Sequence, residues 1–536
     1  MFGPKLSTRT FTLIAIVCAI YCILFIYRTS FVVDGERYFS LFDDAMISMR
    51  YAKNLASGAG LVWNPGERVE GYTNLLWTLY MALLHLLPIS ASKISLLVQV
   101  SGAALIVVNL VIVRKLAEMV FPGSGFASFG AVLLAAFYLP LIGWTLQGME
   151  VGLLALIVTL AVYLTIRNTL RGKFSLLPYI VLTTGMFVRP DMGVPYLVIL
   201  IWAAITDSKM RKRHLIWGLS LLALAVVAQT VFRLLYYGDI LPNTYYLKLT
   251  GFPLIYRLTR GLYVSFVFIW RMGWIIFLIP FAILMRPRNK PATLLLAVFL
   301  GQLGYSIYVG GDAWESWGGS NRYVAIAMPS FFVVFFGALA WLGRLLKDNL
   351  VARKELSYLA LPETERRVKV VALVLCFISF NAIYGPAALT ELLLLKKTLH
   401  VDKNEKMVER ALVLTTITDP EARVAVVWDG AIPYFSGRRA ISILGKNDRH
   451  IARLKMRLPK GPGKVVAFYP GHLKWDYAYS IGRLRPDVVV HLWQAPEEAM
   501  PYLVSDYVEL SLKGMSFYLR KTSPHILWDR VRQLAS

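Results

Sequence analysis

Long apolar runs alternate with short polar segments over the first 390 residues of the chain. The runs cover residues 11–29, 75–90, 94–113, 127–146, 151–166, 175–188, 193–206, 214–235, 261–283, 291–309, 324–346 and 369–390. A helix needs about 20 mostly apolar residues to cross the hydrocarbon core of a bilayer. The pattern therefore predicts a polytopic all-α membrane domain of about 11–13 helices.

The pattern changes after about residue 395, where polar and charged residues become frequent. Short runs rich in β-branched and aromatic residues follow, separated by Gly/Pro turns such as "KGPGK": "RVAVVW" (423–428), "KVVAFY" (464–469), "PDVVVHLW" (486–493) and "SFYLR" (516–520). Runs of this kind between turn residues are typical of strands. We therefore expect two domains, a membrane domain over 1–394 and a small α/β domain over 395–536.

Charge changes the picture by orienting the loops. The chain has 57 Lys and Arg against 32 Asp and Glu, a net charge of +25. The basic residues gather in short loops, at 114–115, 167–173, 209–213, 286–290 and 344–369. The positive-inside bias makes these loops cytoplasmic and the alternate loops extracytoplasmic. We expect a multi-pass protein of the bacterial inner membrane, with residues 395–536 outside the cytoplasm and no nucleic-acid partner.

The first outer loop, residues 30–74, carries two adjacent acids. "DDAMISMRYAKNLA" (43–56) has apolar residues at near-helical spacing, which predicts a short amphipathic helix at the membrane interface. One aspartate at its start could be a helix cap, but a cap explains two adjacent acids poorly. Activation of a hydroxyl group needs an ionised acid within reach. Asp44 is therefore the first candidate for a catalytic carboxylate, and Asp43 the second.

The other outer loops supply candidate substrate-binding residues, each of which also has a structural interpretation. Acids and cations at helix ends either pair with one another or contact a sugar or phosphate. Aromatic residues either line a sugar site or anchor the membrane interface. The candidates are Glu150, Arg189, Asp191, Asn243, Tyr245, Lys248, Asp312, Trp317, Asn321 and Arg322. In the C-terminal domain, "PGHLKWDY" adds His472, Lys474 and Asp476, which either bind the acceptor or pack on the membrane domain.

The string "DDAMISMRYAKNLASGAGLVWNPGERVEGYTNLLWT" (43–78) resembles the first loop of the arabinofuranosyltransferase B family, which belongs to the GT-C class of membrane glycosyltransferases. Further motifs agree in order: "GME" (148–150), "RPD" (189–191), "LPNTYYLK" (241–248), "GGD" (310–312), "NRY" (321–323), "GAIPYFSGRRAISILGKNDRHIA" (430–452) and "PGHLKWDY" (470–477). The resemblance covers nearly the whole chain and implies a GT-C fold.

The resemblance also implies an activity: transfer of arabinofuranose from a polyprenyl-phosphate donor to an extracytoplasmic glycan acceptor. The partners would be the lipid-linked donor, the glycan and the bilayer. The spacing of acids and histidines predicts no metal site and no obligatory cofactor, although a loosely held divalent cation stays compatible with the sequence. Whether the reaction inverts or retains the anomeric configuration stays open.

Two alternatives remain at this point. The first is a transferase of the same class that uses another polyprenyl-phosphate sugar and a protein or lipid acceptor. The second, more distant, is a membrane transporter. Transporters typically carry internal repeats and polar residues at mid-depth in the membrane, and the sequence shows neither.

Overall fold

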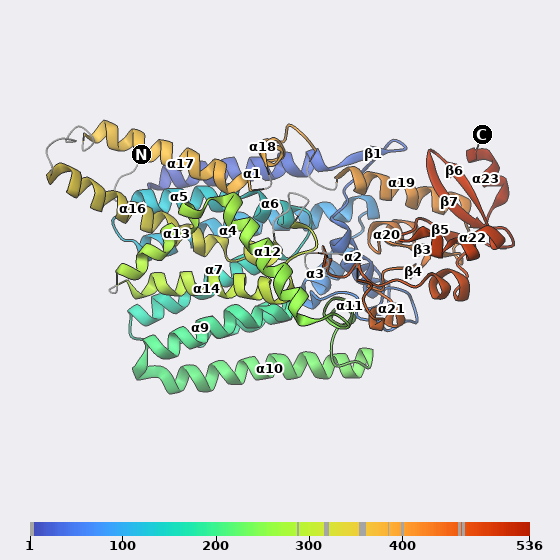
Figure 1. Ribbon diagram of the computed structural model, residues 1–536, viewed down its shortest axis with the longest axis horizontal. Helices are drawn as coiled ribbons and strands as arrows, with labels where there is room; N and C mark the ends of the chain where they lie inside the picture. The colour runs from blue at the N-terminus through green and yellow to red at the C-terminus, as the bar shows by residue number, and fades with distance from the viewer. Residues whose placement is uncertain are drawn as a thin grey trace.

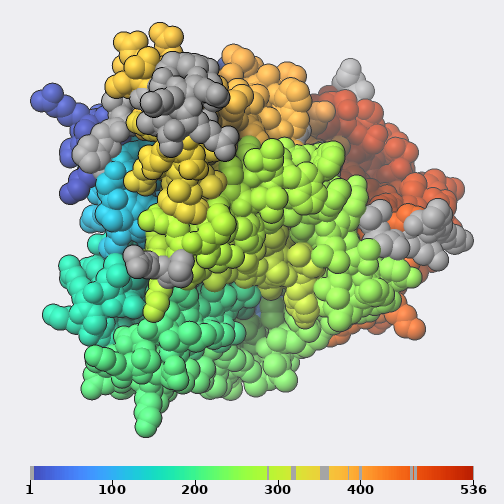
Figure 2. Space-filling model, turned by 60° about the vertical axis from the view of Figure 1, so that its left-hand side comes forward, coloured from blue at the N-terminus to red at the C-terminus, as the bar shows by residue number. Residues whose placement is uncertain are grey.

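The computed structural model describes residues 5–286, 289–315, 321–352, 361–383, 385–397, 401–458, 463 and 467–535. Helices of the first 395 residues form an elongated bundle, and the C-terminal residues form a smaller α/β unit at one end of that bundle (Figure 1). In the space-filling view this orange and red unit packs directly against the helical body (Figure 2).

The helices of the first half of the bundle follow the apolar runs of the sequence. They are α1 (Thr8–Thr29), α3 (Leu75–His85), α4 (Ala91–Val120), α5 (Gly125–Phe137), α6 (Leu139–Leu146), α7 (Val151–Leu170), α8 (Leu177–Val188), η1 (Pro190–Met192), α9 (Gly193–Thr206), η2 (Ser208–Met210) and α10 (Arg211–Tyr237).

The second half continues in the same way, with one bent pair at its start and another at its end. Its helices are α11 (Asn243–Leu249), α12 (Leu254–Met272), α13 (Trp274–Leu278), η3 (Ile279–Met285), α14 (Lys290–Val309), α15 (Arg322–Ala325), α16 (Met328–Ala352), α17 (Pro362–Asn381) and α18 (Pro386–Leu392).

Within the described residues, six helices are long and apolar enough to cross a membrane, and up to nine spans result if each bent pair is one span. The bent pairs are α5–α6, α11–α12 and α17–α18, with angles of 41°, 84° and 100°. The helix at 75–85 has 11 residues, which is too short to cross a bilayer and fits the half-span that its short apolar run suggests. The chain is a multi-pass membrane protein.

Close contact between α5 and α16 depends on glycine. A Cβ atom added at Gly130 would lie 2.4 Å from the ring of Phe336, and one added at Gly337 would lie 2.2 Å from the ring of Phe121. Gly130 therefore lets α16 approach α5 closely, and Gly337 lets α16 approach the end of α4.

The first loop folds as a hairpin followed by a helix. Strands β1 (Phe31–Val33) and β2 (Glu36–Tyr38) pair antiparallel, and α2 spans Asp43–Ala56, the residues that the sequence pattern predicts to be helical. This helix does not lie on a membrane surface as expected, because nine of its first ten residues are buried under protein. It is wedged between the helical bundle and the C-terminal region, where it packs on α3 and α20.

The C-terminal region contains a mixed five-stranded sheet of order β4-β3-β5-β7-β6. Strands β4 (Arg439–Ser442), β3 (Arg423–Val426) and β5 (Val488–Val489) are parallel, β7 (Met515–Arg520) pairs antiparallel with β5, and β6 (Tyr507–Leu512) pairs antiparallel with β7. Helices complete the region: α19 (Val401–Ile417), α20 (Ala431–Ser436), α21 (Arg449–Arg453), η7 (Ala478–Arg483), η8 (Pro496–Glu498), α22 (Met500–Asp506) and α23 (Trp528–Ala535). The fold is thus a polytopic helical domain with a small α/β unit, as the sequence predicts.

Three of the four strand-like runs contain strands, namely those that begin at residues 423, 486 and 516. The fourth, "KVVAFY", lies partly outside the described residues, and its described part, 467–469, has no strand.

Candidate functional site

A small pocket lies where the helical bundle meets the C-terminal region. It is enclosed by the start of α2, the end of α11, the segment before α15 and two loops of the C-terminal region. The residues that line it are Asp44, Lys248, Asp312, Ala313, Trp314, Arg322, Tyr323, Lys446, Pro470 and His472. Five of the sequence candidates meet here: Asp44, Lys248, Asp312, Arg322 and His472.

Asp44 lies between two cations that come from distant parts of the chain. Its Oδ2 accepts from Arg322 Nη1 at 3.2 Å, and its Oδ1 accepts from Lys446 Nζ at 2.9 Å. Burial alone would raise the pKa of Asp44, but the charges of Lys446 and Arg322 hold this pKa well below its usual value. Asp44 is therefore ionised over the physiological pH range, although it faces little water.

Arg322 is held in place from three sides. It makes a bidentate pair with Asp312, with Nε at 2.8 Å from Oδ2 and Nη2 at 2.9 Å from Oδ1. Its guanidinium also lies 5.0 Å from the ring centroid of Trp144. Asp312 is 1% exposed and Arg322 is 6% exposed, so the pair is preorganised before any ligand arrives.

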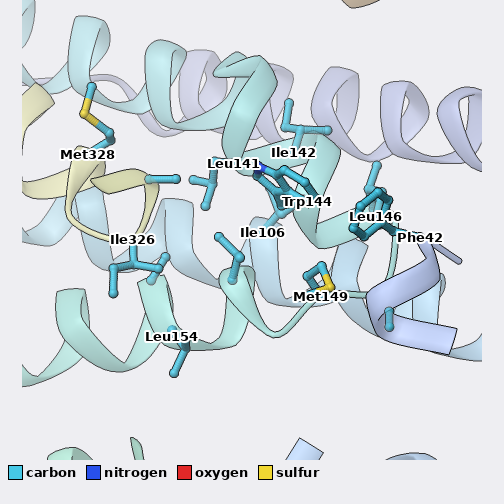
Figure 3. Close-up of a cluster of buried hydrophobic side chains, with 14 of the residues drawn as sticks. Phe42, Ile106, Leu141, Ile142, Trp144, Leu146, Met149, Leu154, Ile326 and Met328 are labelled. Carbon is cyan, nitrogen blue, oxygen red and sulfur yellow. The ribbon is translucent and has the colours of Figure 1, made fainter. Parts of the chain in front are cut away.

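An apolar cluster packs around Phe42, next to the pocket. Phe42, the residue before the two aspartates, packs edge-to-face on Trp144 at 5.1 Å and on Trp314 at 5.0 Å. Figure 3 shows Phe42 beside Trp144 and Leu146 in this cluster. Buried apolar packing of this density leaves the start of α2 little freedom, which fixes where Asp44 points.

Lys248 differs from the other two cations of the pocket. Among the described residues, it makes no hydrogen bond or close ion pair, whereas Arg322 and Lys446 both contact Asp44. Its alkyl chain lies against Gly471, where an added Cβ would be 3.3 Å from Lys248 Cε. The pocket thus contains one ammonium group whose hydrogen-bonding capacity is not used by the protein described.

Asp43 is adjacent to Asp44 but has a different environment. Its Oδ1 accepts from the backbone N–H groups of Gly430 and Ala431, at 3.2 and 3.0 Å, where α20 begins. Neither aspartate caps its own helix, since the N-cap residue is Phe42 and it makes no side-chain cap bond. Burial raises the pKa of Asp43 to about 6. Asp43 therefore joins α2 to the C-terminal region and does not line the pocket.

Lys446 is the charged pocket residue that the sequence candidates do not include. Asn243, one of the sequence candidates, donates from Nδ2 to the carbonyls of Gly445 and Lys446 at 2.9 and 3.0 Å and so positions the loop. A signal was available, because ligand sites form at the carboxyl ends of parallel strands. Lys446 follows β4, and Asp429 follows the adjacent parallel strand β3.

A second ion cluster contains Glu150, Arg189 and Asp191. Arg189 makes a bidentate contact with Asp191 at 2.8 and 2.9 Å, and its Nη1 donates to Glu150 Oε1 at 3.0 Å. The other oxygen of Glu150 accepts from Asn74 at 2.9 Å. None of the three charged residues lines the pocket, although Tyr323, which does, lies over the Arg189 guanidinium at 5.2 Å.

The remaining candidates make contacts of other kinds. Asn321 accepts from the backbone N–H groups at the start of α15 and so caps it. Lys474 donates to the carbonyls of Tyr246 and Ala452, at 2.9 and 2.7 Å, and holds α11 and α21 together. Asp476 accepts from the backbone of Tyr479, and Tyr245 is 38% exposed. Trp317 lies outside the described residues.

A large apolar groove opens at the other end of α2. It has a volume of about 860 Å³, and α3, α4 and α7 form most of its wall. The groove residues are Leu55, Ala56, Leu76, Trp77, Leu79, Tyr80, Ala82, Leu83, Leu86, Ser101, Ala104, Leu105, Val108, Leu153 and Leu156. At about 1.5 Å per residue, Leu55 lies about 16 Å along α2 from Asp44.

Within the described residues, no group of three or more His, Cys, Asp or Glu could hold a metal ion.

The fold is similar to those of solved membrane glycosyltransferases. ArnT from Cupriavidus metallidurans, in a crystal structure bound to undecaprenyl phosphate, has 12% identity and a TM-score of 0.54, and the match covers 96% of this chain and 98% of ArnT. Archaeal oligosaccharyltransferase AglB from Archaeoglobus fulgidus, solved with an inhibitory peptide and a dolichol-phosphate, has 11% identity and a TM-score of 0.53, over 96% of this chain and 74% of AglB. These likenesses show that the chain has the GT-C fold.

Comparisons of the sequence itself are less informative about function. Residues 397–523 match a family model described as a domain of unknown function, DUF8728. A search of curated proteins finds no match.

Proposed function

We propose that this protein transfers a sugar from a polyprenyl-phosphate donor to an acceptor hydroxyl group at the pocket around Asp44. The observation that carries the proposal is the joint presence of an ionised, paired carboxylate and an ammonium group, Lys248, with no protein partner among the described residues. A phosphate fits the ammonium, and an acceptor hydroxyl fits the carboxylate. The GT-C fold gives independent support, because ArnT with that fold has been solved with undecaprenyl phosphate bound.

The chemistry assigns different tasks to the charges. In the reaction, the bond from the anomeric carbon to the phosphate oxygen breaks and a bond to the acceptor oxygen forms. Polyprenyl phosphate leaves with the bonding electron pair, and the cation of Lys248 stabilises its charge. The proton of the acceptor hydroxyl passes to Asp44 or, through it, to water.

Asp44 is a weak base while its cations are unopposed, because they lower its pKa. An anionic phosphate bound beside Lys248 and Arg322 would partly neutralise the positive field around the carboxylate. The pKa of Asp44 would then rise, and its ability to take or orient a proton would increase. Asp44 would thus become a stronger base only when the donor is bound.

The apolar groove beside α3 is the proposed place of the polyprenyl chain. Its lining is almost entirely aliphatic and aromatic, which suits a hydrocarbon tail and offers few polar contacts. The α2 helix connects the groove to the pocket, so one lipid-linked sugar could occupy both. We further propose that residues 395–536 form an extracytoplasmic domain, since the basic loops that the positive-inside bias places in the cytoplasm belong to the other end of the bundle.

The finer assignment is arabinofuranose as the sugar and a cell-wall glycan as the acceptor. It rests on the resemblance of the loop motifs to arabinofuranosyltransferases. No contact in the described pocket supports it. A transferase that moves another polyprenyl-phosphate sugar to a protein or lipid acceptor would have the same charges, so the sugar has to be identified by experiment.

The experiment is a donor panel. Purified protein is incubated with polyprenyl phosphates that carry different sugars, and release of polyprenyl phosphate and glycosylated product is measured by mass spectrometry. We expect turnover with at least one donor and the highest rate with arabinofuranose. Absence of release with every donor, by protein that is folded, would contradict the proposed function.

Orientation is tested separately by labelling. Glu497 is exposed and distant from the ion pairs of the pocket, so Glu497→Cys should react with a membrane-impermeant reagent in intact spheroplasts. Protection there, with labelling only after lysis, would place the C-terminal region in the cytoplasm.

A further inference from the structure

His472 lies at the wall of the pocket in an aromatic cluster. Its ring stacks on Tyr469 with centroids 4.2 Å apart and contacts Trp314 edge-to-face at 5.7 Å. Trp493 packs at 5.6 Å and its Nε1 donates to the His472 carbonyl at 3.0 Å. Only 2% of His472 is exposed. The imidazole therefore has one orientation, fixed by its neighbours before any ligand binds.

The hydrogen bonds also determine where the imidazole proton lies. Nδ1 is 2.9 Å from the carbonyl oxygen of Pro470, which can only accept, so Nδ1 carries the hydrogen atom. Nε2 then presents a lone pair. Burial, together with the charge of Lys446, lowers the pKa of His472 to about 3, so the ring is neutral at physiological pH.

Nε2 is buried and has no hydrogen-bond partner among the described residues. A buried acceptor without a donor is costly, and since His472 lines the pocket, a ligand bound there with a hydroxyl group supplies the donor. The two carboxylates of the pocket are satisfied, since Arg322 occupies both oxygens of Asp312 and cations occupy both oxygens of Asp44.

Among the described residues, the pocket thus offers two groups of opposite kind that have no hydrogen-bond partner, the ammonium of Lys248 and the neutral acceptor Nε2 of His472. Gly471, next to His472, contacts the Lys248 side chain, so the two positions are close together. Their complement is an anion joined to a hydroxyl donor, which is the chemistry of a glycosyl phosphate. A carboxylate at this position would be less suitable, because it would repel the phosphate.

We propose that His472 Nε2 accepts a hydrogen bond from a hydroxyl group of the donor sugar and so discriminates between sugars. This inference rests on the proposed function, since it assumes a sugar phosphate beside Lys248. His472 is a specificity-determining residue under this proposal and takes no part in proton transfer.

The first test uses a matched pair of variants. His472→Asn retains a donor toward the Pro470 carbonyl but has no atom at the Nε2 position, whereas His472→Gln places an amide oxygen near it. With the best donor of the panel, we expect the Asn variant to lose about 10- to 100-fold in kcat/KM and the Gln variant to recover part of that loss. Equal activity of wild type and the Asn variant would overturn the proposal.

The second test identifies the hydroxyl group. Singly deoxygenated analogues of that donor are assayed with wild type and His472→Asn. One analogue should lose about 10- to 100-fold with wild type and show no further loss with the variant, because the same hydrogen bond is absent in both cases. A purely structural role predicts that each analogue loses the same factor with His472→Asn as with wild type, and that result would contradict the proposal.

A third measurement needs no variant at His472. In protein labelled with nitrogen-15 histidine and carrying Asp44→Asn to prevent turnover, addition of donor should shift the Nε2 resonance of one neutral imidazole. The deoxy analogue identified above should not cause this shift. A wild-type protein that turns over no donor would contradict the proposed function, whereas turnover without the shift or the analogue effect would contradict this inference alone.

Discussion

The two buried ion clusters at the end of the helical bundle have similar members but different surroundings. In the Glu150–Arg189–Asp191 cluster every charged group is satisfied by the others and by Asn74, and none of the three lines the pocket. In the Asp44 cluster the charges line a pocket that also contains a cation, Lys248, with no hydrogen bond or close ion pair among the described residues. Charge and position at a helix end are therefore insufficient to identify a site; unused hydrogen-bonding capacity beside the charge is the informative difference.

The same lesson holds for the adjacent aspartates. Asp43 binds two backbone N–H groups of the C-terminal region, while Asp44 faces side-chain cations around the pocket. One residue along a helix rotates a side chain by about 100°. A pair of adjacent acids can thus serve one structural and one chemical purpose, with α2 as the element that separates them.

The largest expected effect is the loss of turnover in Asp44→Asn. A positioned acid–base group contributes about 100- to 10,000-fold in rate, so turnover should fall by about that factor while polyprenyl phosphate still binds. Asp43→Asn is the matched control, because the amide oxygen can still accept from Gly430 and Ala431. We expect it to retain near-normal turnover. Equal losses in both variants, measured with the same donor, would remove the distinction between the two acids.

Glu150→Gln should affect stability and leave the chemistry intact. Removal of one partner from a buried ion pair costs about 3–5 kcal/mol, and Arg189 would still hold Asp191. We expect a lower thermal unfolding midpoint in detergent, with turnover per folded molecule little changed. Glu497→Gln, at an exposed acid, serves as the control with neither effect. A variant of Glu150 with normal stability and lost turnover would instead assign this acid to substrate.

Lys248→Met tests the pocket cation that makes no hydrogen bond among the described residues. A hydrogen bond to a charged group contributes about 1.5–3 kcal/mol, so the Kd for polyprenyl phosphate should rise by about 10- to 100-fold. Lys474→Met is the comparison, because that ammonium already donates to the carbonyls of Tyr246 and Ala452. Its Kd should stay near the wild-type value. An unchanged Kd in Lys248→Met would mean that the phosphate binds elsewhere.

The sequence predicted local features well and long-range contacts poorly. The helix at 43–56 and the strands near 423 and 516 follow from periodicity and turn residues, because these signals lie within a few residues of one another. The Lys446–Asp44 contact joins residues 402 positions apart, and no local pattern contains it. Strand β4 was missed because its four residues, "RAIS", are too short and too polar for a strand pattern.

The two candidate outcomes for a buried charged residue, pairing and ligand binding, could not be separated from sequence either. Arg189 lies directly after an apolar run and Arg322 lies directly before one, yet of the two only Arg322 lines the pocket. The difference arises from tertiary packing, and the motif "RPD" carries no trace of it.

The smallest expected effect concerns Asp429. This residue follows β3, and Lys446 follows the adjacent strand β4. It is fully buried, Asn447 donates to one of its oxygens at 2.8 Å, and burial raises its pKa to about 7. The pKa of Asp429 in the folded protein lies above its value in an unfolded chain. The folded protein therefore binds this proton more tightly than the unfolded chain does. Stability from this group is therefore fully present at low pH and is lost as the pH rises through about 7.

Asp429→Asn removes the titration, so the wild type should gain stability relative to the variant by a few degrees in Tm when the pH falls from about 8 to about 5. Asp43 titrates in the same window but is present in both proteins, so the comparison cancels its contribution. Parallel Tm curves for the two proteins would contradict a titration of Asp429 between about pH 5 and pH 8.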